Sequence, residues 1–253
     1  MDFQHSEEQE ILVNSVQSFV KKELLPHEDE VDRQDDVSYE LAANIRLKAQ
    51  KAGLYAFNIP KEGGGPGLDF VSQALIEREL SKCSWALHVN VGRPSNVLMA
   101  CKGDQIDEYL KPCVNGEKID CFALTEPGAG SDANAINTKA KKDGSDFILN
   151  GSKHFISHAG HADFIIVFAV TGSYEHKGRS RNEVTSFLVD SNSKGLTIKR
   201  GPACTSNRGY HTFELFFDEC RISSEKVLGE VAKGWDVANK WLTAGRVMVA
   251  ANC

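Results

Sequence analysis

Apolar residues recur every three to four positions through most of residues 1–115, the spacing of helices that bury one face. The first such stretch, residues 6–25, begins with a capping signal, since Ser6 can cap the helix while Gln9 reaches back to it. A second stretch, residues 38–54, ends in a glycine, as helices often do. The pattern therefore predicts that the chain opens with helices.

Helical periodicity resumes after a glycine-rich loop, "PKEGGGPGLDF" at residues 60–70. Residues 84–102 are mostly apolar and predict a buried helix. Residues 103–116 predict an amphipathic helix that turns Ile106, Tyr109 and Leu110 inward. We therefore expect an all-α N-terminal domain over residues 1–115.

The periodicity changes to that of strands near residue 118. Two dipeptides that favour hairpin turns, Asp143-Gly144 and Asn150-Gly151, are each flanked by strand-like residues and predict an antiparallel meander. Further strand candidates lie at residues 163–170, 184–190, 196–200 and 211–220. Short strands with polar connections are typical of a small antiparallel β-barrel or sandwich, which we place at residues 116–230.

Helical periodicity returns over residues 231–253. We expect this segment to be the first helix of a C-terminal α-helical domain. The predicted fold class is thus α+β with several domains: helices, then an antiparallel β domain, then the start of a second helical domain.

Composition and charge narrow the classes of partner. The 253 residues carry a net charge of -6, which argues against a nucleic-acid footprint, and no apolar run is long enough to span a membrane. The seven cysteines form no CxxC pair and suit reduced thiols. The N-terminus lacks the features of a secretory signal. We expect a cytoplasmic protein, or a mitochondrial matrix protein whose transit peptide has been removed.

The segment "CFALTEPGAGSD", residues 121–132, places a turn rich in glycine directly after a strand-like run. Backbone N–H groups exposed between Glu126 and Gly130 would form a nest for a phosphate or a flavin edge, with the hydroxyls of Thr125 and Ser131 at its ends. A tight surface turn between strands is the alternative. The spacing is not GxGxxG, which disfavours a Rossmann or P-loop site.

Three segments together resemble the acyl-CoA dehydrogenase family: "LTEPGAGSD", "LNGSKHFIS" and "RGYHTFELFFDECRISSEKVLGEVAKGW". The resemblance extends over the whole chain and is most specific in the first two segments. It implies an FAD-dependent flavoprotein of fatty acid and lipid metabolism, with helical, β and helical domains in that order.

The resemblance assigns roles to two segments. It implies that Phe122 to Ser131 follow the flavin, with the Leu124 backbone and the Thr125 hydroxyl on the ring and Gly130 and Ser131 by the pyrophosphate. Phe155, Ile156 and Ser157 would cover the other side of the ring, and at Phe155 the family often has tryptophan. Ser131 and Arg246 are the substrate-binding candidates, Arg246 because it matches a family position near the CoA moiety.

The implied reaction is the α,β-dehydrogenation of an acyl-CoA thioester to the trans-2-enoyl-CoA. The family's base is usually a glutamate in a C-terminal helical domain that we expect to be missing here, and in one branch it precedes the arginine that matches Arg246. That position is Gly245, and Asp236 has no assigned role. We therefore assign no catalytic residue and expect the isolated chain to be inactive. The alternatives are a non-catalytic flavin- or acyl-CoA-binding subunit that needs a partner domain, and a flavin oxidase or monooxygenase on the same scaffold.

Partners and secondary candidates follow from the same resemblance. It implies an acyl-CoA substrate, electron-transfer flavoprotein or a similar acceptor, and a homo-oligomer in the full-length protein. A basic segment at Lys177, Arg179 and Arg181 could meet the CoA 3′-phosphate or could be a solvated hairpin tip. The histidines at 154, 158 and 161 lack a carboxylate or cysteine at ligand spacing, so we predict no metal site.

Overall fold

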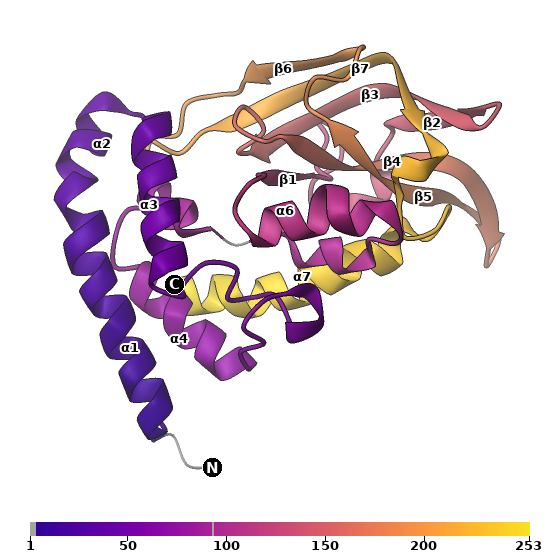
Figure 1. Ribbon diagram of the computed structural model, residues 1–253. Helices are drawn as coiled ribbons and strands as arrows, with labels where there is room; N and C mark the ends of the chain where they lie inside the picture. The colour runs from indigo at the N-terminus through magenta and orange to yellow at the C-terminus, as the bar shows by residue number, and fades with distance from the viewer. Residues whose placement is uncertain (1–3, 93) are drawn as a thin grey trace.

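A computed structural model describes residues 4–92 and 94–253, with only the backbone described at 241, 243 and 244. A helical layer lies beside a curled mixed sheet that forms a half-barrel, and the last helix runs beneath the sheet (Figure 1). The α-helices are α1 (Glu7–Phe19), α2 (Glu28–Gln34), α3 (Tyr39–Lys51), α4 (Phe70–Leu80), α5 (Trp85–His88), α6 (Lys111–Val114) and α7 (Gly234–Asn252). Shorter π or 3-10 turns are η1 (Val20–Leu24), η2 (Leu25–His27), η3 (Lys61–Gly63), η4 (Val89–Val91), η5 (Asn96–Ala100), η6 (Ile106–Leu110), η7 (Ala133–Ala135) and η8 (Ser224–Lys226).

The helical start of the chain forms as the sequence predicts. The amide of Gln9 donates to Ser6 Oγ at 3.2 Å and the amide of Ser6 donates to Gln9 Oε1 at 3.1 Å, so both halves of the capping box are present. α1 continues through η1, and its buried side chains Val16 and Phe19 pack in a helical-domain core with α3 and α4. No helix among the described residues is both long and apolar enough to cross a membrane.

The single buried helix predicted over residues 84–102 is wrong. The structure has three short pieces there, α5, η4 and η5. Gly92 adopts a left-handed φ of 95°, and Pro94 follows it without an N–H to continue a helix. The predicted burial does hold for Leu87, Val97 and Leu98, which are all buried.

The strands are β1 (Asp120–Ala123), β2 (Lys139–Asp143), β3 (Asp146–Ser157), β4 (Phe164–His176), β5 (Arg179–Asp190), β6 (Leu196–Arg200), β7 (Thr212–Ser223) and β8 (Val227–Leu228). Their order in the sheet is β6-β7-β3-β2-β4-β5-β8, and β1 pairs with β4. The expected β domain is present and most of its strand pairs are antiparallel, but the sheet is mixed, because β1 and β2 both pair with β4 in parallel. One apolar core fills the half-barrel, and a second lies between its outer face and α7, which packs from β5 to α4 (Figure 1).

Only the first of the two predicted hairpins exists. β2 and β3 pair from Asp143 and Asp146 onwards, which confirms a tight turn after Asp143. At Asn150-Gly151 the chain does not reverse. β3 runs on through both residues, and its register against β7 shifts between Leu149 and Gly151, so the Asn-Gly pair marks a bulge.

We expect Gly151→Ala to lower the free energy of unfolding by about 1–3 kcal/mol, measured by urea denaturation. Gly151 has a φ of 145°, and a Cβ there would lie 2.7 Å from the Cα of Thr138, the residue just before β2. Gly144→Ala is the control, because its φ of 61° is also left-handed but a Cβ would meet no atom within 4 Å. An equal loss in both variants would show that the close approach of β2 to β3 has no effect on stability.

Candidate functional site

The glycine-rich turn after β1 is closed by its own backbone. The amides of Glu126 and Ala129 each donate to the other residue's carbonyl at 3.1 Å. The predicted nest is therefore smaller than expected, because the amides of Glu126 and Ala129 are already used. In the part of the chain that the structure describes, the amides of Gly130 and Ser131 donate to no protein acceptor.

Gly130 leaves the far end of this turn open. It is exposed, its φ is not left-handed, and a Cβ built on it would meet no atom within 4 Å. Ser131 beside it is exposed as well. The two adjacent free amides and the serine hydroxyl thus face open space where an anion can approach the backbone closely.

A buried ion pair beneath the turn is the feature that sequence analysis missed. Lys153 Nζ lies 2.8 Å from Glu126 Oε1, and the two side chains are 0% and 6% exposed. Lys153 Nζ also donates to the carbonyl of Leu124 at 3.1 Å. The Lys153 ammonium holds the pKa of Glu126 below its ordinary value despite burial, which alone would raise it. One lysine on β3 therefore fixes the backbone and the carboxylate of the turn after β1.

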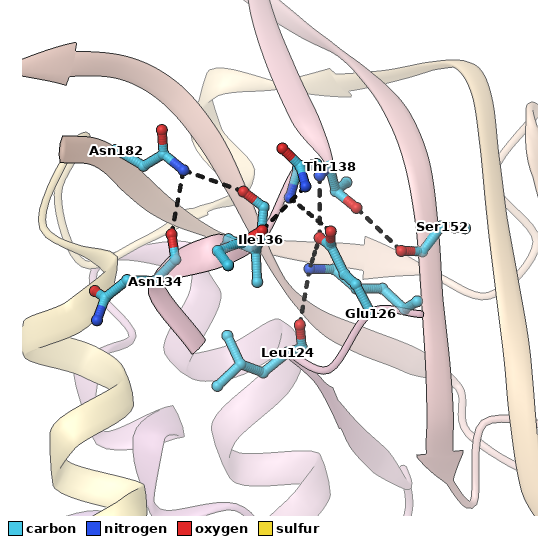
Figure 2. Close-up of polar contacts among 10 residues, drawn as sticks. Leu124, Glu126, Asn134, Ile136, Thr138, Ser152 and Asn182 are labelled. Carbon is cyan, nitrogen blue, oxygen red and sulfur yellow. Dashed lines mark hydrogen bonds and ion pairs between the residues drawn. The ribbon is translucent and has the colours of Figure 1, made fainter. Parts of the chain in front are cut away.

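The Glu126 carboxylate is saturated by backbone donors (Figure 2). The amide of Asn137 donates to Oε2 at 2.6 Å and that of Thr138 to Oε1 at 3.0 Å. The Thr138 hydroxyl in turn donates to the carbonyl of Ser152 at 3.2 Å. Because a carboxylate with this many donors is well satisfied, the buried charge anchors the loop between β1 and β2.

The backbone joins the same two segments directly. The amide of His154 on β3 donates to the carbonyl of Thr125 at 2.9 Å. Thr125 itself is partly buried at the start of the turn. The two segments singled out in the sequence, residues 122–131 and 155–157, are therefore brought together and held by a main-chain bond as well as by the ion pair.

Phe155 projects from an irregularity near the end of β3. Its φ of 57° is left-handed, and the register of β3 against β7 shifts between Lys153 and Ile156. The ring is 55% exposed, whereas Ile156 beside it is 2% exposed. The bulge thus turns a large aromatic side chain outward, so Phe155 is not a core residue.

Ser157 ends β3 and is held by a residue that sequence analysis did not select. The Tyr210 hydroxyl donates to Ser157 Oγ. The segment that carries Tyr210 is docked on the helical layer, since the amide of Gly209 donates to the Asp35 carboxylate at 2.9 Å. The helical layer therefore positions the hydroxyl at the end of β3.

The remaining predicted residues lie on α7 and on an exposed hairpin. Arg246 is exposed, and Gly245 borders a cavity of about 360 Å³ between α7 and the helical layer. No acidic residue lines that cavity among the described residues. The basic residues Lys177, Arg179 and Arg181 are exposed around the turn between β4 and β5.

The three histidines do not form a metal site in the described part of the chain, where no group of three or more His, Cys, Asp or Glu side chains could hold a metal ion. His154 instead lies 3.1 Å from Glu214 through Nδ1. Its neighbours at 158 and 161 face a separate cavity, described below.

A signal for the ion pair does exist in the sequence. β3 alternates between buried and less buried positions, and Lys153 falls at a buried one after the bulge at Gly151. A charged residue at an inward position of an apolar strand requires a counter-ion. The conformation of the loop between β1 and β2 decides which carboxylate becomes the counter-ion of Lys153. Hydrophobic periodicity does not predict the conformation of that loop.

Two family models match the chain. The acyl-CoA dehydrogenase N-terminal domain matches residues 6–117, and the acyl-CoA dehydrogenase middle domain matches residues 121–220. Among curated proteins, the 3-(aryl)acrylate reductase of Clostridium sporogenes is 34% identical over 251 residues, which are 97% of this chain and 64% of the relative.

Solved structures of the same family superpose on the whole chain. The butyryl-CoA dehydrogenase of Megasphaera elsdenii aligns with a TM-score of 0.83 and 31% identity, over 100% of this chain and 66% of that one. An acyl-CoA dehydrogenase from Bacillus anthracis, complexed with FAD, aligns with a TM-score of 0.83 and 27% identity, over 98% of this chain and 42% of that one. The chain thus spans less than two thirds of the length of each of these three proteins.

Proposed function

This chain belongs to the acyl-CoA dehydrogenase family, and on that premise we propose that it binds FAD and takes part in the α,β-dehydrogenation of an acyl-CoA thioester. The proposed flavin contacts are Phe122, Leu124, Thr125, Gly130, Ser131, Phe155, Ile156 and Ser157. The observation that carries the proposal is the buried Lys153–Glu126 pair, because it locks together the two segments that contribute all eight residues.

The described residues fit such a cofactor. The free amides of Gly130 and Ser131 suit the pyrophosphate, since backbone N–H groups in open space bind phosphate oxygens. The exposed Phe155 ring suits one face of a flavin ring. Since the Leu124 carbonyl already accepts from Lys153, the Leu124 amide and the Thr125 hydroxyl are the groups available to the ring edge.

The chain's own residues would orient the reactants. When bound, FAD supplies the acceptor for the hydride that leaves the substrate's β-carbon. Ser157, held by Tyr210, presents a hydroxyl of fixed direction beside the ring. Arg246 and Ser131 are the proposed contacts of the CoA moiety, where a cation and a hydroxyl suit phosphate groups. An electron-transfer flavoprotein as acceptor and a homo-oligomeric full-length protein belong to the same proposal.

Removal of the α-proton requires a general base, and one branch of the family carries it at the position of Gly245, which lines the cavity of about 360 Å³ beside α7. Since no described acidic residue lines that cavity, we expect negligible dehydrogenation by the 253-residue chain with FAD. Gly245→Glu adds a carboxylate where a Cβ meets no atom within 4 Å. We expect it to exceed the matched Gly245→Gln variant by roughly 10²- to 10⁴-fold in reduction of an artificial acceptor.

The flavin assignment is tested by titrating the purified chain with FAD while its visible spectrum is recorded, then adding acyl-CoA thioesters. We expect saturable spectral changes with FAD. The absence of any spectral change would rule out the flavin site. Turnover by the unchanged chain that equals turnover by Gly245→Glu would show that the base lies elsewhere, and Asp236 and Glu230 would then be replaced first.

A further inference from the structure

A second cavity, of about 370 Å³, lies between the helical layer and the β domain. Its walls come from α3, α5, the turn after β3 and the segment before β7. Phe122 and Ser157 lie on its edge, so it adjoins the proposed flavin segments. A cavity of this volume is within the range of small-molecule sites.

The acidic side chains that line this cavity all have partners. Asp36 lies 3.4 Å from His211 Nε2, and Glu77 lies 3.0 Å from His88 Nε2. Asp120 accepts from the amide of Ser95 at 3.2 Å. Asp36 and Glu77 thus each lie beside an imidazole, and Asp120 is held by a backbone amide.

Four basic side chains that line the cavity have no carboxylate partner in the described ranges; one is Lys118, which donates to the carbonyl of Glu108. Within the described ranges, Arg46 of α3 and the histidines at 158 and 161 form no ion pair, although all three line the cavity. Nearby cations on the surface do have partners, since Arg200 and Arg208 lie 3.6 Å from Asp35 and Asp32. Of Arg46 and the two histidines, Arg46 carries a permanent positive charge, and no ion pair in the described ranges balances it.

The electrostatics of His158 are consistent with that imbalance. Burial, followed by His161 and Arg46, lowers the pKa of His158 to about 4. No acidic group offsets their effect on this imidazole. His158 is therefore neutral near pH 7, which leaves the Arg46 guanidinium as the charge that an anion would balance.

Aromatic rings lie directly beside these histidines, since the ring centroids of His158 and Tyr210 are 5.5 Å apart and those of His161 and Phe213 are 6.4 Å apart. Trp85, Tyr210 and Phe213 line the cavity as an aromatic wall, and the rings of Trp85 and Tyr210 pack edge to face with centroids 6.1 Å apart. The Tyr55 hydroxyl donates to the carbonyl of Cys113 at 2.8 Å, so this ring too contributes its apolar body. Flat aromatic walls favour a planar apolar ligand.

We propose that this cavity binds a carboxylate carried on a planar apolar body, with Arg46 as its counter-ion. A guanidinium matches a carboxylate in two parallel hydrogen bonds, and the aromatic wall holds the rest of the ligand. The carboxylate can belong to a free acid or to the far end of an acyl group whose thioester lies at the flavin. The free-acid form stands without the proposed dehydrogenase function, whereas the acyl form rests on it.

The test is calorimetric titration of the chain with trans-cinnamate and with its neutral analogue cinnamamide. We expect cinnamate to bind, and Arg46→Met to weaken its binding roughly 10- to 100-fold while leaving cinnamamide unchanged. Arg46→Lys should retain part of the affinity for cinnamate. The exposed Lys142→Met is the control for loss of one positive charge, and Ala42→Phe should fill the cavity and abolish binding of both ligands.

A parallel arm compares a CoA thioester that ends in a carboxylate with one that ends in a methyl group. Arg46-dependent binding of cinnamate identifies a free acid, and Arg46-dependent binding of the carboxylate-ended thioester alone identifies an acyl end. Equal affinities for cinnamate and cinnamamide, no effect of Arg46→Met, or no binding in either arm would overturn the proposal. FAD binding is recorded on the same samples, so a failure of the flavin assignment is seen separately.

Discussion

Lys153→Met lowers the free energy of unfolding by about 3–5 kcal/mol and abolishes measurable FAD binding; this is the largest effect we expect of a single substitution. The lysine is fully buried and satisfies both Glu126 and the Leu124 carbonyl. Its removal leaves a buried carboxylate without its counter-ion, whose desolvation is then uncompensated. Urea denaturation measures the stability, and flavin fluorescence measures the binding.

Lys142→Met on β2 is the matched control, because Lys142 is exposed and should change stability by no more than about 0.5 kcal/mol. The double variant Lys153→Met/Glu126→Leu should be more stable than the single variant, since no charge is then left buried. A single variant as stable as the wild type would show that the pair does not hold the site.

The Lys153–Glu126 pair predicts how the free energy of unfolding changes with pH. Because Lys153 keeps the pKa of Glu126 below its ordinary value of 4.5, the folded state binds the Glu126 proton less readily than the unfolded state does. The stabilisation is therefore present above the unfolded pKa, and it is lost as pH falls through the lower, folded pKa.

Gly130→Val should weaken FAD binding by roughly 10²- to 10⁴-fold while leaving stability nearly unchanged. The backbone of Gly130 is not left-handed, and a Cβ would meet no protein atom within 4 Å, so the folded chain accepts valine. The isopropyl group would instead occupy the open space through which a phosphate reaches the amides of Gly130 and Ser131. Isothermal titration with FAD gives the affinity.

Gly128→Val is its control within the same turn. Gly128 is also exposed, with no atom within 4 Å of a Cβ, but it is not among the proposed contacts. We expect Gly128→Val to bind FAD much more tightly than Gly130→Val. Equal affinities would move the pyrophosphate away from Gly130.

Local sequence signals predicted those parts of the fold that depend on local structure. The capping box at Ser6 and the turn after Asp143 formed because their hydrogen bonds join residues only a few positions apart. The Asn150-Gly151 turn failed because the long antiparallel pairing of β3 with β7 outweighs a local turn preference, and a bulge satisfies both. The parallel pairing of β1 with β4 joins distant segments, which local periodicity does not encode.

The functional site, like the fold, was predicted from the sequence only where it depends on local motifs. The turn after β1 and the aromatic residue on β3 were selected from their motifs, and the structure brings both segments together. Tyr210 was not selected, since its hydroxyl bond to Ser157 joins residues 53 positions apart. Glu126 lay inside the selected motif, but its role as a counter-ion follows only from the inward position of Lys153.

Phe155 has a consequence for how this chain would respond to selection in the laboratory. A bulky residue in the left-handed region costs roughly 1–3 kcal/mol, and here the ring gains little burial in return. Selection for thermostability alone would favour glycine or asparagine at this position, because either residue tolerates the same backbone at lower cost. Variants evolved in that way would gain stability and lose the aromatic face. A library screened for heat resistance without a flavin-binding screen would therefore drift towards stable chains that lack the aromatic ring we propose for the flavin.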